Sequence, residues 1–188
     1  MAKSLVLSLL ILLVAGTAQA TTFDLAFNNE SAQVELGQPI VVDELGASEV
    51  GARFLYNDDE ETKLGSLGLL FTGEPGNVPG LKLGIGAQGY LGSTDRDQDL
   101  LAAAVGGTVR YAPPALGGVA MLAKLYFAPR IFSGLDCEQL WETEVRAGYN
   151  LTPRVQVHLG YQAIRSEFDS YDTWTIDDAI RLGFQASF

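Results

Sequence analysis

The sequence predicts an all-β protein: an antiparallel, up-and-down transmembrane β-barrel of eight strands, with ten strands as the alternative. Three observations predict this fold. Apolar and polar residues alternate with a period of two along most of the chain. Five of the seven prolines, together with many glycines, fall in turn-like clusters between the alternating runs. The chain also ends on an alternating run, RLGFQASF, whose last residue is a phenylalanine.

Residues 1–20 have the features of a secretory signal peptide, namely a basic residue, an apolar run and small residues before the cleavage position. The apolar run, Leu5–Val14, is too short to span a membrane as a helix. Cleavage after Ala20 would leave 11 basic and 23 acidic side chains, a net charge of −12. So acidic a chain is a poor ligand for nucleic acid. The single cysteine, Cys137, has no partner for an internal disulfide.

The N-terminal segment, residues 21–46, is the least regular part of the mature chain. Its apolar residues share one parity before Asn28 and the other parity after it: Phe23, Leu25 and Phe27, then Ala32, Val34 and Leu36. A tight turn at Asn28-Asn29 would explain the switch and add a hairpin to the barrel. A single bulged strand is the alternative. The barrel then occupies residues 47–188 with eight strands, or ten if the hairpin joins it, and both counts are even, as a single-chain bacterial barrel requires.

Eight alternating runs follow, each of roughly nine to thirteen residues once its flanks are included, which suits a tilted membrane-crossing strand. They cover residues 48–56, 65–71, 81–91, 101–111, 119–127, 141–151, 155–163 and 180–188. The turn-like sequences EPGNVPG, PPALGG and TPR follow the second, fourth and sixth runs. Longer acidic sequences follow the first, third, fifth and seventh runs.

The face opposite the apolar residues carries charged side chains in the middle of the strands, interleaved with glycines. These residues are Glu49, Arg53, Lys82, Arg110, Lys124, Glu142, Glu144, Arg146, His158 and Arg181. A closed polar interior pairs such charges across strands, and glycines make room for the long side chains. We therefore expect these ten residues to form a network inside the barrel, with the apolar face turned outward toward lipid.

Aromatic residues on the apolar face fall near the strand ends, where the two interfaces of a bilayer favour them. Given up-and-down connectivity, they form two groups: Tyr56, Phe127 and Trp141 at one end, and Phe71, Tyr111, Tyr149 and Phe188 at the other. The four odd-numbered connections lie at the first of these ends, and they hold 12 acidic and two basic residues. We expect this acidic end, with its mostly longer connections, to face the cell exterior.

The densest acidic residues in these connections are Asp58, Asp59, Glu60, Glu61, Asp95, Asp97 and Asp99. Clustered carboxylates suit hard cations, but the sequence lacks the glycine and the final glutamate of a complete calcium loop. We therefore predict solvated loops, with no metal site and no cofactor. Divalent ions that bridge these acids to lipopolysaccharide phosphates would make outer-membrane lipid and lipopolysaccharide the partners of this surface.

The C-terminal residues Gly183, Phe184, Ala186 and Phe188 resemble the terminal signal by which the barrel-assembly machinery recognises outer-membrane barrels. Ala186 departs from that pattern, because a bulky residue is more usual there. The stretches VGARFLYNDDEE, LGSLGLLFTG and LKLGIGAQGYLG resemble the YfaZ family of predicted Gram-negative outer-membrane proteins. The resemblance implies a small outer-membrane barrel and supplies no catalytic residue.

Three functions are compatible with such a barrel. Eight strands leave an interior that side chains fill, which favours a structural or surface-interaction role. A narrow channel for small solutes or ions is the alternative, especially with ten strands. A lipid hydrolase or acyltransferase is the second alternative, in which His158 would act with Glu142 or Glu144. We predict no catalytic residues, because His158 points inward by parity and no suitable serine lies beside it.

Overall fold

The structure is a computed structural model that describes residues 21–42, 46–59, 61–94, 99–168 and 171–188. Its strands are β1 (Thr22–Phe27), β2 (Ser31–Val42), β3 (Ala47–Asn57), β4 (Thr62–Gly73), β5 (Leu81–Ser93), β6 (Asp99–Tyr111), β7 (Val119–Ala128), β8 (Ser133–Leu135), β9 (Cys137–Thr152), β10 (Val155–Phe168) and β11 (Tyr171–Ser187). Two short 3-10 helices, η1 (Pro114–Leu116) and η2 (Arg130–Phe132), lie in connections. Among the described residues, no helix is long and apolar enough to span a membrane.

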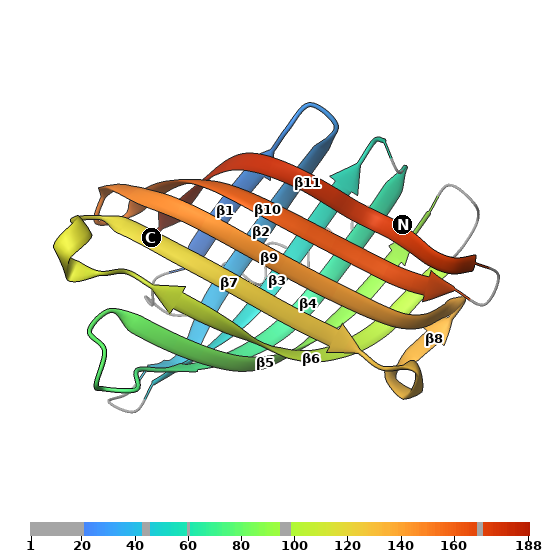
Figure 1. Ribbon diagram of the computed structural model, residues 1–188, viewed down its shortest axis with the longest axis horizontal. Coiled ribbons are helices and arrows are strands. Elements are labelled where there is room, and N and C mark those ends of the chain that lie inside the picture. The colour runs from blue at the N-terminus through green and yellow to red at the C-terminus, as the bar shows by residue number, and fades with distance from the viewer. Residues whose placement is uncertain (1–20, 43–45, 60, 95–98, 169–170) are drawn as a thin grey trace.

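Ten antiparallel strands close into a barrel (Figure 1). Each strand pairs with its sequence neighbours, except that β7 pairs with β9, and β1 closes the ring by pairing with β11 from Thr22↔Ser187 to Phe27↔Leu182. The short strand β8 pairs only with β6 and lies outside the ring. The ten-strand alternative is therefore confirmed, and the main prediction of eight strands is wrong.

The two additional strands come from the N-terminal segment, whose parity switch marks a hairpin turn. The Asn28 side-chain oxygen accepts hydrogen bonds from the backbone N–H groups of Glu30 and Ser31, at 3.0 and 2.6 Å. The backbone N–H of Asn28 donates to the Ser31 carbonyl at 2.9 Å. These bonds reverse the chain between β1 and β2, so both strands join the sheet between β11 and β3.

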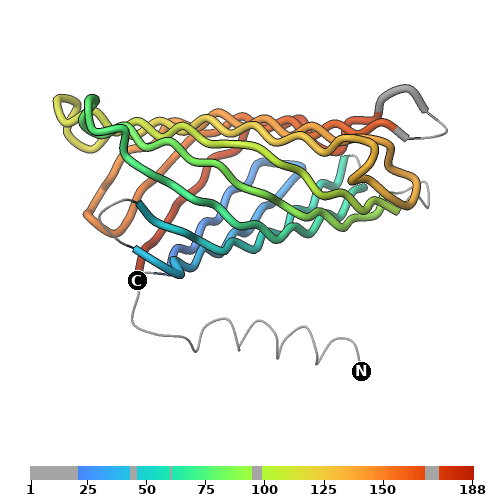
Figure 2. Tube along the Cα trace, turned by 90° about the horizontal axis from the view of Figure 1, so that it is seen from below, coloured from blue at the N-terminus to red at the C-terminus, as the bar shows by residue number. Residues whose placement is uncertain are grey.

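The two ends of the barrel differ in charge more than in connection length. We call the end where β1 begins and β11 ends the terminal end, and the opposite end the loop end (Figure 2). The predicted connection 166–175 is largely an extended hairpin, because β10 runs to Phe168 and β11 starts at Tyr171. The connections 74–80 and 112–118 at the terminal end are also no shorter than most at the loop end. The expected excess of loop length is therefore absent, and only the acidic charge distinguishes the loop end.

Apolar side chains point outward over the whole wall of the barrel, and they remain exposed there. Ile85 is 73 % and Leu67 is 64 % exposed, although both lie in the middle of strands. Near the loop end, Trp141 packs against Phe127 with ring centroids 4.1 Å apart. Near the terminal end, Tyr111 and Tyr149 are exposed on the same outer surface. An apolar belt between two aromatic girdles is the outer surface of a membrane barrel.

Candidate functional site

The lumen near the loop end is filled by an apolar layer. The inward side chains there belong to six strands and are at most 1 % exposed: Leu55, Leu64, Leu100, Leu140, Ile164 and Ile176. Trp174 packs against this layer. These packed aliphatic side chains replace the polar residues that line the lumen below them.

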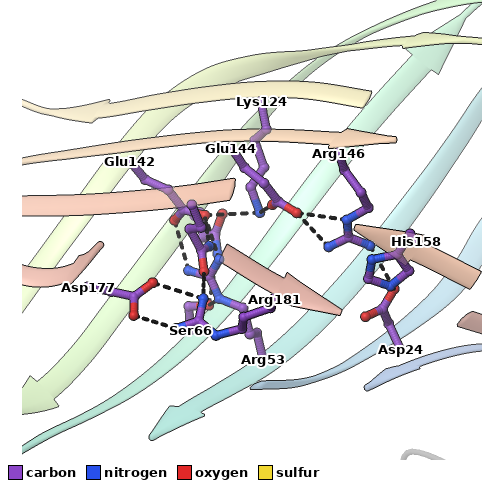
Figure 3. Close-up of polar contacts among 12 residues, drawn as sticks. Asp24, Arg53, Ser66, Lys124, Glu142, Glu144, Arg146, His158, Asp177 and Arg181 are labelled. Atoms are coloured by element: carbon purple, nitrogen blue, oxygen red, sulfur yellow. Dashed lines mark hydrogen bonds and ion pairs between the residues drawn. The ribbon is translucent and has the colours of Figure 1, made fainter. Parts of the chain in front are cut away.

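Below the apolar layer, an ion pair crosses the whole lumen (Figure 3). The Arg53 guanidinium donates two hydrogen bonds to the Glu142 carboxylate, from Nη1 to Oε1 at 2.5 Å and from Nη2 to Oε2 at 2.8 Å. Arg53 lies on β3 and Glu142 on β9, which are diametrically opposite in the ring of ten. Tyr90 donates to Glu142 Oε2 at 2.5 Å, and Lys124 Nζ lies 3.0 Å from Oε1. Glu142, fully buried, is therefore the centre of the polar interior.

Charges of alternating sign continue from this centre toward the terminal end. Lys124 also pairs with Glu144 at 3.2 Å, and Arg146 pairs with both Glu144 and Asp24. The Arg146 Nη1 to Asp24 Oδ2 distance is 2.7 Å. His158 Nε2 lies 3.1 Å from the same Asp24 oxygen. The chain of pairs thereby links β7, β9, β10 and β1 across the lumen.

A second branch of the network lies between β11 and β3. Arg181 forms an ion pair with Asp177 and donates to Ser31 Oγ at 2.8 Å and to Gln162 Oε1 at 3.1 Å. Asn57 donates to Asp177 Oδ1 at 3.0 Å. Four cations whose side chains are at most 10 % exposed thus face four buried anions: Arg53, Lys124, Arg146 and Arg181 with Glu142, Glu144, Asp24 and Asp177. Balanced charge and multiple hydrogen bonds offset the desolvation of so many buried ions.

Beyond the network, the lumen widens into a cavity of about 400 Å³ toward the terminal end. Of the ten residues predicted to form one network, three line this cavity without joining the network: Glu49, Lys82 and Arg110; Arg53, Lys124, Glu144 and Arg146 of the network line it as well. Lys82 pairs with Glu74 at 3.2 Å, and both side chains are more than half exposed. The other seven join the network of ion pairs described above, which we call the ionic layer. The interior therefore holds both the ionic layer and, toward the terminal end, charges that water can reach.

Two members of the network were missed in the sequence. Asp24 alternates with Phe23 and Leu25, so its parity would have placed it inside once β1 was accepted as a strand. Asp177 lies in β11, just after a stretch interpreted as a connection, and before the run that began at Ile180. Asp24 also replaces the expected partners of His158, because the imidazole lies beside Asp24 rather than beside Glu142 or Glu144.

The acidic connections hold exposed carboxylates with mostly local partners. Asp58 accepts a hydrogen bond from Tyr56 at 2.7 Å, and the backbone N–H of Asp99 donates to Asp136 Oδ2 at 3.1 Å. Asp59 and Glu61 are exposed. Within the described ranges, no group of three or more His, Cys, Asp or Glu side chains is arranged to hold a metal ion. Glu60, Asp95, Asp97 and the predicted signal peptide, residues 1–20, lie outside the described residues.

The residues of the predicted assembly signal lie on both faces of β11. Phe184 and Phe188 are exposed on the outer surface, Ala186 shares their parity, and Gly183 is buried on the lumen side. A Cβ on Gly183 would lie 2.4 Å from the His158 imidazole and 2.7 Å from the Leu25 carbonyl oxygen. Glycine at this position therefore has a structural reason, apart from any recognition by the assembly machinery.

We expect Gly183→Ala to lower the free energy of unfolding by about 1–3 kcal/mol, because the imidazole and the β1 backbone have to move. Gly160→Ala is the matched control, since its Cβ would meet no atom closer than 3.5 Å. Urea titration of protein refolded into lipid vesicles, without assembly machinery, measures both. Equal midpoints for the two variants would contradict the proposed crowding.

The fold and the polar lumen define an exported β-barrel of the outer membrane. The chain belongs to the YfaZ family: the sequence model of that family, described as YfaZ precursor, matches residues 1–188. A search of the curated proteins finds no match.

The chain is similar to solved structures at low sequence identity. The KdgM porin in complex with disordered oligogalacturonate is 10 % identical, with a TM-score of 0.50 over 90 % of this chain and 99 % of that one. Another structure of the KdgM porin gives 9 % identity and a TM-score of 0.45 over 90 % and 99 % of the two chains. The outer membrane channel DcaP of Acinetobacter baumannii gives 9 % identity and a TM-score of 0.43, over 93 % of this chain and 55 % of that one.

Proposed function

We propose that the protein is a closed outer-membrane barrel, which acts through the surface it exposes rather than by conducting solutes. The observation that carries the proposal is the bidentate Arg53–Glu142 pair across the full width of the lumen. The apolar layer of Leu55, Leu140 and Ile176 lies directly above this pair. Two barriers of different chemistry therefore stand in series.

Both barriers oppose the passage of an ion. Breaking a buried, hydrogen-bonded ion pair by removing one partner costs about 3–5 kcal/mol, so the Arg53–Glu142 pair resists opening. Packed aliphatic side chains act as a hydrophobic constriction, which excludes ions by excluding water. A solute that enters from the terminal end would meet both barriers in turn.

The surface role depends on the orientation of the barrel. We infer that the terminal end faces the periplasm and the acidic loop end faces the exterior, the usual arrangement of bacterial barrels with both chain ends in the periplasm. Carboxylates such as Asp58 and Asp59 would then stand at the level of the lipopolysaccharide phosphates. Divalent cations shared between the two would anchor the barrel in the outer leaflet.

Cysteine labelling on intact cells tests this orientation. Asp59→Cys lies at the loop end and Pro75→Cys at the terminal end, and both positions are exposed. The native Cys137 is buried and provides an unlabelled background. We expect a membrane-impermeant maleimide to label position 59 on intact cells, and position 75 only after the outer membrane is permeabilised. The opposite pattern would overturn the orientation.

A narrow channel is the second candidate, and two observations favour it over an enzyme. The ring has ten strands, and a cavity of about 400 Å³ occupies part of the lumen. The KdgM porin shares this fold and binds oligogalacturonate. A channel predicts solute flux across liposomes that carry the wild-type protein, whereas a closed barrel predicts none. The lipid hydrolase or acyltransferase alternative stays a prediction, and in the structure His158 lies beside Asp24 rather than beside Glu142 or Glu144.

A further inference from the structure

The cavity at the terminal end is lined partly by residues of the ionic layer and partly by two acidic and two basic side chains outside it, which we call the acidic and the basic wall. Glu35 on β2 and Glu49 on β3 line one side, and Lys82 on β5 and Arg110 on β6 line another. Lys82 and Arg110 are directly paired in the register of β5 and β6, so their positive charges lie together. β2 and β6 are four steps apart in the ring of ten, so Glu35 and Arg110 lie nearly opposite each other, whereas Glu49 and Lys82 are on strands only two steps apart.

Most of these charges, unlike those of the ionic layer, form no close ion pair within the protein. Within the described ranges, Glu35, Glu49 and Arg110 make no ion pair and no side-chain hydrogen bond with another described residue, and Lys82 pairs only with the exposed Glu74.

A glycine in β2 makes room for the Glu49 carboxylate on the acidic wall. A Cβ on Gly37 would lie 2.3 Å from Glu49 Oε1 and 2.4 Å from the Thr22 hydroxyl. Glycine at this position of β2 therefore allows the Glu49 carboxylate to lie against the wall, next to Glu35. Two adjacent carboxylates in a partly enclosed site attract a cation more strongly than either does alone.

We propose that this cavity binds a small zwitterion that carries a primary ammonium and a carboxylate. The ammonium would lie against Glu35 and Glu49, and the carboxylate would accept charge-assisted hydrogen bonds from Lys82 and Arg110. The cavity volume is near the lower end of about 300–1,000 Å³ for ligand sites, which suits an amino acid or a dipeptide rather than an oligomer. The inference rests on the proposed closure and orientation of the barrel for one point only: the ligand enters from the periplasm.

Three dipeptide probes of nearly equal size test the charge requirement. They are dialanine, which is a zwitterion, N-acetyl-dialanine, which keeps only the carboxylate, and dialanine amide, which keeps only the ammonium. Calorimetric titration of the full-length barrel, refolded in detergent micelles, measures each affinity. We expect dialanine to bind about ten-fold more tightly than either blocked probe, since each lost contact is a charge-assisted hydrogen bond.

Two variants assign the ends of the ligand to the walls. Glu49→Gln should reduce the affinity for dialanine to that of N-acetyl-dialanine and leave the acetylated probe unaffected. Arg110→Gln should reduce the affinity for dialanine to the affinity for dialanine amide, and it should leave the affinity for the amide unchanged. Arg154→Gln, in an exposed turn at the same end, is the control and should change nothing.

Equal affinities for the three probes, no binding of any probe, or no effect of the two cavity variants would overturn the proposal. The result is separable from the proposed function, because binding in micelles depends neither on the orientation of the barrel nor on its closure. Conductance by the wild-type protein would refute closure and leave the preference among the three probes as a separate measurement.

Discussion

Glu142→Ala is expected to lower the free energy of unfolding by about 3–5 kcal/mol, the cost of breaking a buried ion pair by removing one partner. Glu142 has no exposed surface and accepts from Arg53, Tyr90 and Gln162, with the Lys124 ammonium 3.0 Å away. Its loss leaves two buried cations that repel each other and a buried phenol without its acceptor. Equilibrium unfolding in urea, from lipid vesicles, measures the effect.

Glu74→Ala provides the matched control for this prediction. It removes one partner of the exposed Lys82–Glu74 pair, and exposed pairs contribute only about 0–1 kcal/mol. If the two variants unfold at the same urea concentration, the lumen around Glu142 is hydrated. The ionic layer would then be no barrier.

The second large effect is expected from removing both barriers at once. A variant that combines Arg53→Ser and Glu142→Ser with Leu55→Ala and Leu140→Ala deletes the crossing pair without changing the net charge, and it thins the apolar layer. We expect liposomes that carry this variant to swell in an isosmotic solution of a small sugar, because water can then fill a continuous path. Heat-modifiable gel migration identifies the folded fraction of each preparation.

Each half of this variant serves as a control for the whole. The serine pair alone leaves the apolar layer intact, and the alanine pair alone leaves the ion pair intact. Both are expected to swell no faster than protein-free liposomes. Swelling caused by either half would mean that a single barrier closes the lumen, and that the other layer only packs it.

The alternation of apolar and polar residues was enough to predict the membrane barrel and the side to which residues of the eight predicted runs point. Arg53, Glu142 and Arg181 could be assigned to the interior because a period of two leaves little freedom once the apolar face is outside. The strand count was not determined in the same way. The parity switch at Asn28 fits a hairpin as well as a bulge, and only the pairing of β1 with both β2 and β11 decides between them.

The sequence could not predict which residues form pairs across the lumen. Arg53 and Glu142 are 89 residues apart, and their meeting depends on the strand number and stagger, which set the diameter of the barrel. The extended hairpin of β10 and β11 was missed for another reason. The stretch SEFDSYDTWT carries polar residues at both parities, so it gives no alternating signal.

Single-channel recording of the wild-type protein in a planar bilayer tests the central claim, a lumen closed by two layers, most directly. The structure predicts no conductance steps from wild-type protein, under conditions in which the variant without both barriers produces them. Reproducible steps from the wild-type protein, altered when Lys82 or Arg110 is neutralised, would contradict the closed barrel and support a channel.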